Sequence, residues 1–299
     1  MLKRLFLLAM VGCLGMPMAQ ACDACGGSIS GGGMGLLAPL RNNAIGLSWQ
    51  YASFQTAPAQ GQGSIDQFHS VELSARYYFT DRFSVQLFQP YRFNLREVEE
   101  ERSNLSGIGD TRIIGTYNLF RQQDLGSGIQ LFAELGAGVK LPVGEYDPDI
   151  HDANLPENFN LGNGSWGFIL QPNLVFTKGA WGLLLNGSYQ HFLPTRTDYQ
   201  FGHQLSGQLS VFWEKSTAKG YRFIPNLGLQ QEHIWADAYA NDRTVSGTGG
   251  TGTFASLGIN IRKGQVLGGV NYAIPIIQEY SQGEVEAQQR LAIQFSYLF

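Results

Sequence analysis

The stretch Leu291-Ala292-Ile293-Gln294-Phe295-Ser296-Tyr297-Leu298-Phe299 closes the chain with a strict alternation of side chains. Side chains of an extended strand point alternately to its two faces. One face therefore carries the larger apolar residues, which are Leu291, Ile293, Phe295, Tyr297 and Phe299. The other face carries Ala292, Gln294, Ser296 and Leu298. The pattern predicts a terminal β-strand, either in a membrane barrel or in a soluble sandwich.

The first residues favour the membrane barrel. A basic start at Met1-Leu2-Lys3-Arg4, an apolar run at 5–11 and the small-residue site Ala19-Gln20-Ala21 are typical of a secretory signal peptide over residues 1–21. A secreted chain that ends on an aromatic strand is typical of bacterial outer-membrane β-barrels. In that case Phe295, Tyr297 and Phe299 form the assembly signal, and the barrel-assembly machinery is a partner.

The composition points the same way. Charged residues make up 15% of the chain, against about 25% in soluble domains. Glycine (38 residues) and aromatic residues (12%) are frequent, as expected of strands with lipid on one side and water on the other. The net charge of −4 argues against a nucleic-acid partner. After the signal peptide, no run reaches the ~18 apolar residues of a membrane helix.

Alternating segments recur through the rest of the chain. We expect strands at about 43–54, 67–79, 83–95, 108–120, 129–141, 166–177, 181–192, 203–213, 221–232, 252–262, 265–277 and 289–299. Short connections follow the even-numbered strands, and long polar loops at 55–66, 96–107, 142–165, 193–202, 233–251 and 278–288 follow the odd-numbered ones. This arrangement predicts an all-β, antiparallel, up-and-down transmembrane barrel of about twelve strands over residues 43–299. Residues 22–42 would form a periplasmic N-terminal segment.

The apolar face is expected to meet lipid. On the first strand it comprises Ile45, Leu47, Trp49 and Tyr51. Aromatic residues near the short turns would form an interfacial girdle. These are Phe79, Phe83, Tyr117, Trp181, Trp213, Tyr221, Tyr297 and Phe299.

The opposite, polar face carries few charges. They are Glu72, Arg76, Arg92, Asp110, Arg112, Glu134, Lys140, Glu232 and Arg290. Two interpretations remain open, and both can hold. The charges neutralise one another and stiffen a narrow lumen, or a surplus of cations (Arg92, Arg112, Lys140 and Arg290) attracts anionic or polar solutes to its mouth.

Cys22-Asp23-Ala24-Cys25 is the sharpest chemical motif. The spacing allows a disulfide or two thiolate ligands to a soft metal such as Cu(I) or Zn(II). Lipidation of Cys22 is a third possibility. A second CxxC, which would complete a zinc site, is lacking. We expect no other cofactor.

No enzyme signature is found. There is no Gly-x-Ser-x-Gly elbow, and no pattern of a barrel phospholipase or protease. The acidic loops around Glu99 and Asp149 are expected to be solvated or to bridge lipopolysaccharide through divalent ions.

Four glycine-rich motifs carry a resemblance to a known family. Gly107-Ile108-Gly109-Asp110, Leu141-Pro142-Val143-Gly144, Gly162-Asn163-Gly164-Ser165 and Gly187-Ser188-Tyr189 occur in that order. Residues 105–299 thereby resemble the outer-membrane transporter family named for the meta-pathway of phenol degradation. The resemblance implies an outer-membrane channel, and it would set Asp110 in the lumen beside Arg112 as a structural pair.

These observations favour a passive outer-membrane channel in which small solutes diffuse through a polar lumen. The alternative is a closed structural or metal-handling barrel that uses Cys22 and Cys25. A soluble periplasmic sandwich is the third and weakest alternative.

Overall fold

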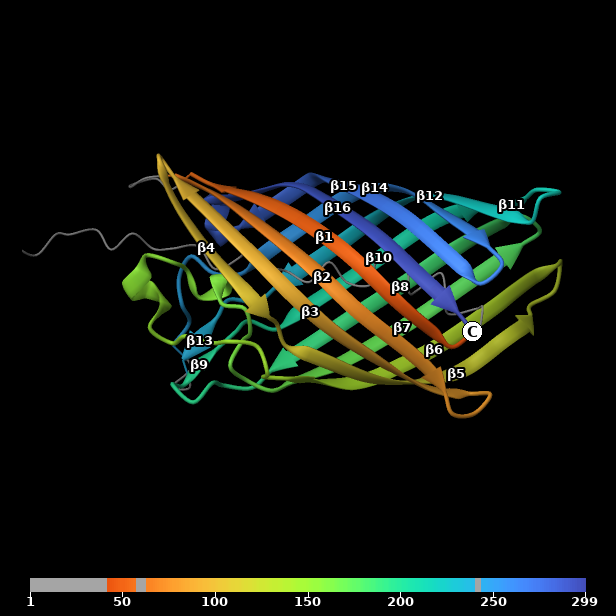
Figure 1. Cartoon of the computed structure of the whole chain (residues 1–299), viewed down its shortest axis with the longest axis horizontal. Helices are drawn as coiled ribbons and strands as arrows, with labels where there is room; N and C mark the ends of the chain where they lie inside the picture. The colour runs from red at the N-terminus through yellow and green to blue at the C-terminus, as the bar shows by residue number, and fades with distance from the viewer. Residues whose placement is uncertain (1–41, 58–62, 240–242) are drawn as a thin grey trace, which may run out of the picture.

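The computed structural model describes residues 42–57, 63–239 and 243–299, which form a closed antiparallel β-barrel (Figure 1). The strands are β1 (Ala44–Thr56), β2 (Ser64–Tyr78), β3 (Phe83–Val98), β4 (Glu101–Ile108), β5 (Thr111–Asp124), β6 (Ile129–Leu141), β7 (Gly167–Lys178), β8 (Trp181–Phe192), β9 (Tyr199–Gln200), β10 (Gln204–Trp213), β11 (Lys215–Ser216), β12 (Tyr221–Ile234), β13 (Ala238–Tyr239), β14 (Gly250–Lys263), β15 (Val266–Tyr280) and β16 (Val285–Leu298). Three short 3₁₀ helices lie in the connections: η2 (Ile150–Ala153), η3 (Glu157–Phe159) and η4 (Ser281–Gly283). None of the helices in these ranges is long and apolar enough to cross a membrane.

The barrel closes where its first and last strands meet. β1 pairs with β16 from Ala44↔Leu298 to Thr56↔Val285. β10 pairs with β12, which completes the circle. β4 and β5 share one position, because both pair with β3. The barrel therefore has twelve strand positions, and the predicted fold class is confirmed.

The two ends of the barrel differ. Brief connections such as 79–82, 179–180 and 264–265 join strands at one end, which we call the turn end. The connections at the other end include segments 142–166 and 193–203, and we call it the loop end. In Figure 1 the C-terminus lies at the turn end, and the β9–β13 pair lies at the loop end.

Most of the observed strands follow the predicted ones, and β6 and β8 agree residue for residue. The predicted loop 96–107 is wrong, because β3 and β4 continue as a hairpin that turns at Glu99 and Glu100. The strands also extend into the predicted loops 55–66 and 278–288. Polar residues on both faces had indicated loops, but strands can go on pairing beyond the level where one face must be apolar.

The outward face is apolar, as predicted. The predicted side chains Ile45 and Leu47 are exposed on it, together with Leu73 and Tyr77 of β2 and with Phe295, Tyr297 and Phe299 of the terminal stretch. The girdle residues Phe79, Trp181 and Trp213 are exposed at the turn end. An exposed apolar surface of this extent is expected of a protein in lipid rather than in water.

Candidate functional site

The lumen brings the predicted inward charges together in ion pairs. Four pairs take up eight of the nine predicted residues. They are Arg76 with Glu134 (3.7 Å), Arg112 with Glu72, Lys140 with Asp110 (2.6 Å) and Arg290 with Glu232 (2.6 Å), the distances joining side-chain nitrogen and oxygen. Buried charges are tolerated when they are paired in this way. The expectation that the inward charges neutralise one another therefore holds for most of these residues.

The expected pairing of Asp110 with Arg112 is wrong. Asp110 lies in the break between β4 and β5, and its carboxylate accepts a hydrogen bond from Lys140 Nζ. Arg112 lies opposite Lys140 in the β5–β6 register and reaches Glu72 instead. Residues two apart in one strand share a face, but Asp110 lies in the break before β5. Its side chain therefore points toward a neighbouring strand, which the spacing alone did not indicate.

Asp110 also holds both ends of a long loop. Its carboxylate accepts backbone hydrogen bonds from Gly144 N at 3.0 Å and from Asn163 N at 2.8 Å. A Cβ on Gly162 would lie 2.5 Å from Asp110 Oδ1 and 2.9 Å from the Cα of Gly144, so this close approach requires glycine. Segment 142–166 therefore leaves and re-enters the barrel wall at one buried carboxylate.

Segment 142–166 folds back over the barrel instead of extending into solvent, and we call it the inward loop. Ile150, Leu155 and Phe159 are buried and pack against Phe68 and Leu105. The Phe159 carbonyl accepts a hydrogen bond of 2.7 Å from the side-chain amide of Asn94 on β3. The acidic residues of this segment were expected to be solvated, but the apolar residues among them could have indicated the packing.

A second buried network lines the wall formed by β12, β14, β15 and β16. Arg290 makes a two-pronged contact with Glu232, with N–O distances of 2.7 and 2.6 Å. The Tyr280 hydroxyl donates a hydrogen bond to the same carboxylate. The Arg290 guanidinium carbon also lies 3.8 Å from the centroid of the Phe254 ring. Glu232 and Arg290 were among the predicted lumen residues, whereas Tyr280 and Phe254 were not.

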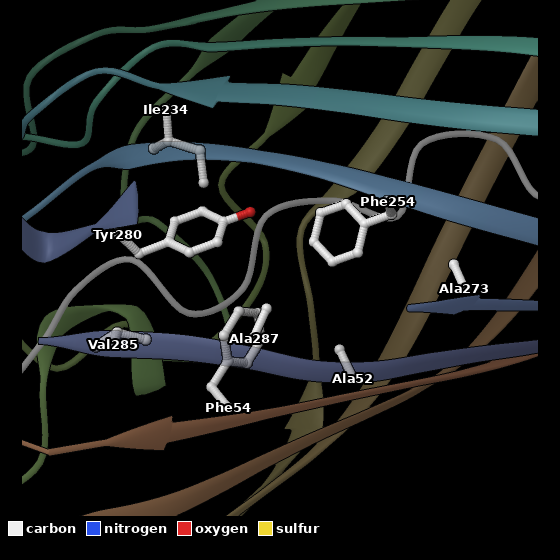
Figure 2. Close-up of a cluster of buried hydrophobic side chains, with 8 residues drawn as sticks. All are labelled: Ala52, Phe54, Ile234, Phe254, Ala273, Tyr280, Val285 and Ala287. Carbon is white, nitrogen blue, oxygen red and sulfur yellow. The ribbon is translucent and has the colours of Figure 1, made fainter. Parts of the chain in front are cut away.

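Figure 2 shows the apolar part of this wall, with the Tyr280 hydroxyl pointing toward the Phe254 ring. The cluster consists of Ala52, Phe54, Ile234, Phe254, Ala273, Tyr280, Val285 and Ala287. The side chains come from β1 and from the strands that follow β10 in the barrel. They fill this side of the lumen near the loop end, and Ala52 and Ile234 also line the larger of the cavities described next.

Two adjoining cavities lie in the lumen among the residues that the structure describes. The upper cavity, of about 150 Å³, lies against the inward loop and is lined by Arg92, Asn94, Asp110, Asn160, Phe192 and neighbouring side chains. The lower cavity, of about 40 Å³, lies toward the turn end and is lined by Ser74, Phe88, Ile114, Ser296 and others. Both cavities are lined by Gln50, Glu72, Arg112 and Gln190. The Arg112–Glu72 pair therefore stands at the boundary between them.

Apolar side chains pack the lumen at the turn end, contrary to the prediction of a polar inward face. We call this packing the turn-end cluster. One part consists of Ala44, Phe88, Ile114, Ile169, Leu267 and Leu298. A second part consists of Phe132, Val175, Leu184 and Phe212. These residues occupy inward positions of their strands. They were not predicted, because the inward face was predicted from its charged and polar residues alone.

Arg92 differs from the other predicted lumen cations. It lies on β3, lines the upper cavity and is partly buried. Among the described residues, no carboxylate oxygen lies within the 4.0 Å of its guanidinium that an ion pair requires. Of the five predicted basic lumen residues, it alone lacks such a partner within the described ranges.

The other predicted site, Cys22 and Cys25, lies outside the residues that the structure describes. Within residues 42–57, 63–239 and 243–299, no group of three or more His, Cys, Asp or Glu side chains could hold a metal ion. The metal and disulfide interpretations of Cys22 and Cys25 stay predictions.

Residues 71–255 match a family described as "Putative MetA-pathway of phenol degradation". The chain belongs to this family. The match to the phenol-degradation family overlaps the four glycine-rich motifs on which the sequence resemblance rested. No curated protein matches the chain by sequence.

Two solved structures of outer-membrane proteins share the β-barrel fold of this chain. An outer-membrane channel from Pseudomonas putida F1 aligns with a TM-score of 0.63 and 16% identity, covering 86% of this chain and 96% of that one. The transport unit of the autotransporter AIDA-I from Escherichia coli aligns with a TM-score of 0.50 and 10% identity, covering 89% and 96%. At these identities the likeness establishes the fold.

Proposed function

We propose that the protein is a passive channel for small solutes in the outer membrane of a Gram-negative bacterium. The observation that carries this proposal is the pair of adjoining cavities, which share the polar side chains Gln50, Glu72, Arg112 and Gln190 near the middle of the lumen. A barrel with a purely structural role has no need of solvent-sized space lined by amides and charges. The barrel-channel fold of the first structural relative agrees with this proposal.

We further propose that the turn end faces the periplasm. Cationic side chains lie over aromatic rings of the girdle there: Lys215 Nζ is 5.7 Å from the Trp213 ring centroid, and Lys263 Nζ is 4.4 Å from that of Tyr221. Such pairs suit the level of lipid headgroups. The acidic loop end would then meet lipopolysaccharide, with divalent ions as bridges.

Passage through this channel requires a change at the turn end. Phe88, Ile114 and Ile169 of the turn-end cluster line the lower cavity. Side chains in such packing exchange rotamers, so transient gaps admit small solutes while larger ones are excluded. We therefore propose a low-conductance channel whose narrowest part is apolar.

The pairing of charges changes which residue sets selectivity. Arg112, Lys140 and Arg290 were expected to bias entry, but each has a carboxylate partner in the lumen. A close pair of opposite charges exerts a much weaker field at a distance than a single charge. We propose that Arg92 makes the main contribution to selectivity.

Planar-bilayer conductance of the purified protein tests the proposed channel. We expect small, rare openings from the wild type and a larger single-channel conductance from the double variant Phe88→Ala/Ile114→Ala, which removes side chains from the boundary of the lower cavity. The matched control is Leu87→Ala, because Leu87 neighbours Phe88 on the outward face. No current from either the wild type or the double variant would refute the channel.

That negative result would favour a closed structural barrel. The observation that supports this second candidate is the combination of four lumen ion pairs with the turn-end cluster. Both features stiffen the interior, and neither requires a solute. The two candidates therefore predict different results for the double variant. Its conductance rises if the protein is a channel and stays absent if the protein is a closed barrel.

A further inference from the structure

Arg92 stands in the upper cavity without a carboxylate of its own. Its guanidinium is always charged and presents a planar fork of donors that matches a carboxylate. Arg112 and Lys140 line the same cavity and already pair with Glu72 and Asp110. A partly buried cation beside two satisfied ones is the arrangement expected of a site whose anion arrives from outside the chain.

The other carboxylates at this cavity are held by groups on the loop side. Asp237 accepts hydrogen bonds from the Tyr199 hydroxyl and from Gly202 N. Glu157 accepts one of 3.3 Å from the Asn160 side chain, and its other oxygen lies 3.3 Å from His151 Nε2. These two acids make the cavity unsuitable for a ligand with a second negative charge, but they do not neutralise Arg92 at β3.

The size of the cavity limits its ligand. At about 150 Å³ the cavity matches the volume known to accept a benzene-sized molecule in a protein interior. Phe68, Phe192 and Phe201 contribute apolar surface to its lining. Such surface favours a flat apolar body, because burying it removes apolar area from water.

We infer that the upper cavity is a binding site for a small organic monoanion, namely one carboxylate on an apolar body of about the size of benzene. The carboxylate contacts the Arg92 guanidinium, and the body lies against the phenylalanine side chains. Glu157 and Asp237 disfavour dianions and keep the carboxylate end at Arg92. The inference rests on the proposed channel, since the lumen is the route by which such a solute reaches the cavity.

Isothermal titration calorimetry of the full-length protein in detergent tests the inference, with protein-free micelles as the blank. The probes are benzoate, phenol, benzylamine and phthalate at neutral pH. They share a ring but differ in charge, being respectively a monoanion, neutral, a cation and a dianion. We expect saturable binding of benzoate and binding of the other three that is weaker by about tenfold or more, as for loss of a charge-assisted contact.

Variants of Arg92 locate the binding. Arg92→Gln should weaken benzoate binding about tenfold or more, and Arg92→Lys should restore part of it. Since Arg92 is in no ion pair with a described residue, both variants should keep the heat-modifiable migration of the folded barrel. The control is Arg102→Gln, because Arg102 lies exposed on the β3–β4 hairpin.

Equal binding of benzoate and phenol, or unchanged benzoate binding in Arg92→Gln, would overturn the inference. Conductance in potassium chloride reports on the channel separately. A conducting protein that does not bind benzoate would refute this site and leave the channel intact. A silent protein that binds benzoate through Arg92 would refute the channel and retain the site.

Discussion

Asp110 and Lys140 form an ion pair inside the barrel wall, with 2.6 Å between Oδ2 and Nζ, and the same carboxylate holds both ends of the inward loop. One side chain therefore joins the wall to the segment that covers the upper cavity. This dual role makes Asp110 a point at which lumen charge and loop position can be altered together.

Asp110→Asn should loosen the inward loop. The substitution leaves Lys140 without its charge partner and weakens the hydrogen bonds from Gly144 and Asn163. We expect a loss of about 3 kcal/mol in unfolding free energy, measured by urea titration in detergent. We also expect faster cleavage by a Glu-specific protease after Glu157, which is buried in the closed loop.

The control for this prediction is Asp81→Asn, because Asp81 pairs with Arg121 in an exposed turn at the other end of the barrel. The unfolding free energy of Asp81→Asn should differ little from that of the wild type, because exposed ion pairs contribute little to stability. Wild-type cleavage rates in Asp110→Asn would contradict the role of Asp110 in holding the loop.

Tyr280→Phe should destabilise the wall network without altering its packing. The change removes the hydroxyl that donates to Glu232 and keeps the ring in its apolar cluster. We expect a cost of about 2 kcal/mol, because the acceptor is a buried carboxylate. The comparison is Tyr272→Phe, whose hydroxyl bonds to Gln289 on the exposed face. Equal thermal midpoints for the two variants would speak against the network.

Removal of Phe299 should impair assembly before it affects transport. Phe299 N donates a backbone hydrogen bond to Asn43 O at 2.9 Å, and its ring stacks on Tyr297 with centroids 6.4 Å apart. The heat-modifiable band in outer-membrane fractions measures assembly, and we expect it to fall. Phe93→Ala, at an outward position of β3, is the control. Normal assembly of the truncated chain would show that Phe299 does not belong to the assembly signal.

Cys22 and Cys25 should form an intramolecular disulfide in the oxidising periplasm. Maleimide should then label the purified protein only after reduction, and Cys25→Ser should leave one thiol that reacts without reductant. Intact-mass measurement also reveals whether the chain starts at Cys22 and whether that residue carries lipid. Stoichiometric copper or zinc in protein prepared under reducing conditions, lost in Cys25→Ser, would instead support the metal interpretation.

The barrel itself was predictable because lipid and water impose a pattern on each strand. β6 and β8 are bounded by turns and alternate in polarity along their whole length, so their limits could be found from the chain alone. The β3–β4 hairpin was missed because it continues beyond the level at which one face must be apolar. There the sequence Glu101-Arg102-Ser103-Asn104 has no apolar residue on either face.

The candidate site was predictable as a set of residues but not as an arrangement. The side-chain period identified Glu72, Asp110, Arg112 and Lys140 as inward charges. Their partners depend on the strand register and on the break at Gly109 and Asp110, which no local pattern encodes. The inward loop covers a cavity that lies between residues distant in sequence, so Arg92 could be recognised as unpaired only in three dimensions.

The position of Leu298 has a consequence for the order of events during biogenesis. Leu298 belongs to the turn-end cluster, and it also pairs with Ala44 across the junction of β1 and β16. In a partly inserted barrel that is still open along this junction, the turn-end cluster is incomplete. We therefore expect the interior to be sealed only when β1 pairs with β16, so that one contact both joins the two ends of the sheet and completes the packing inside it.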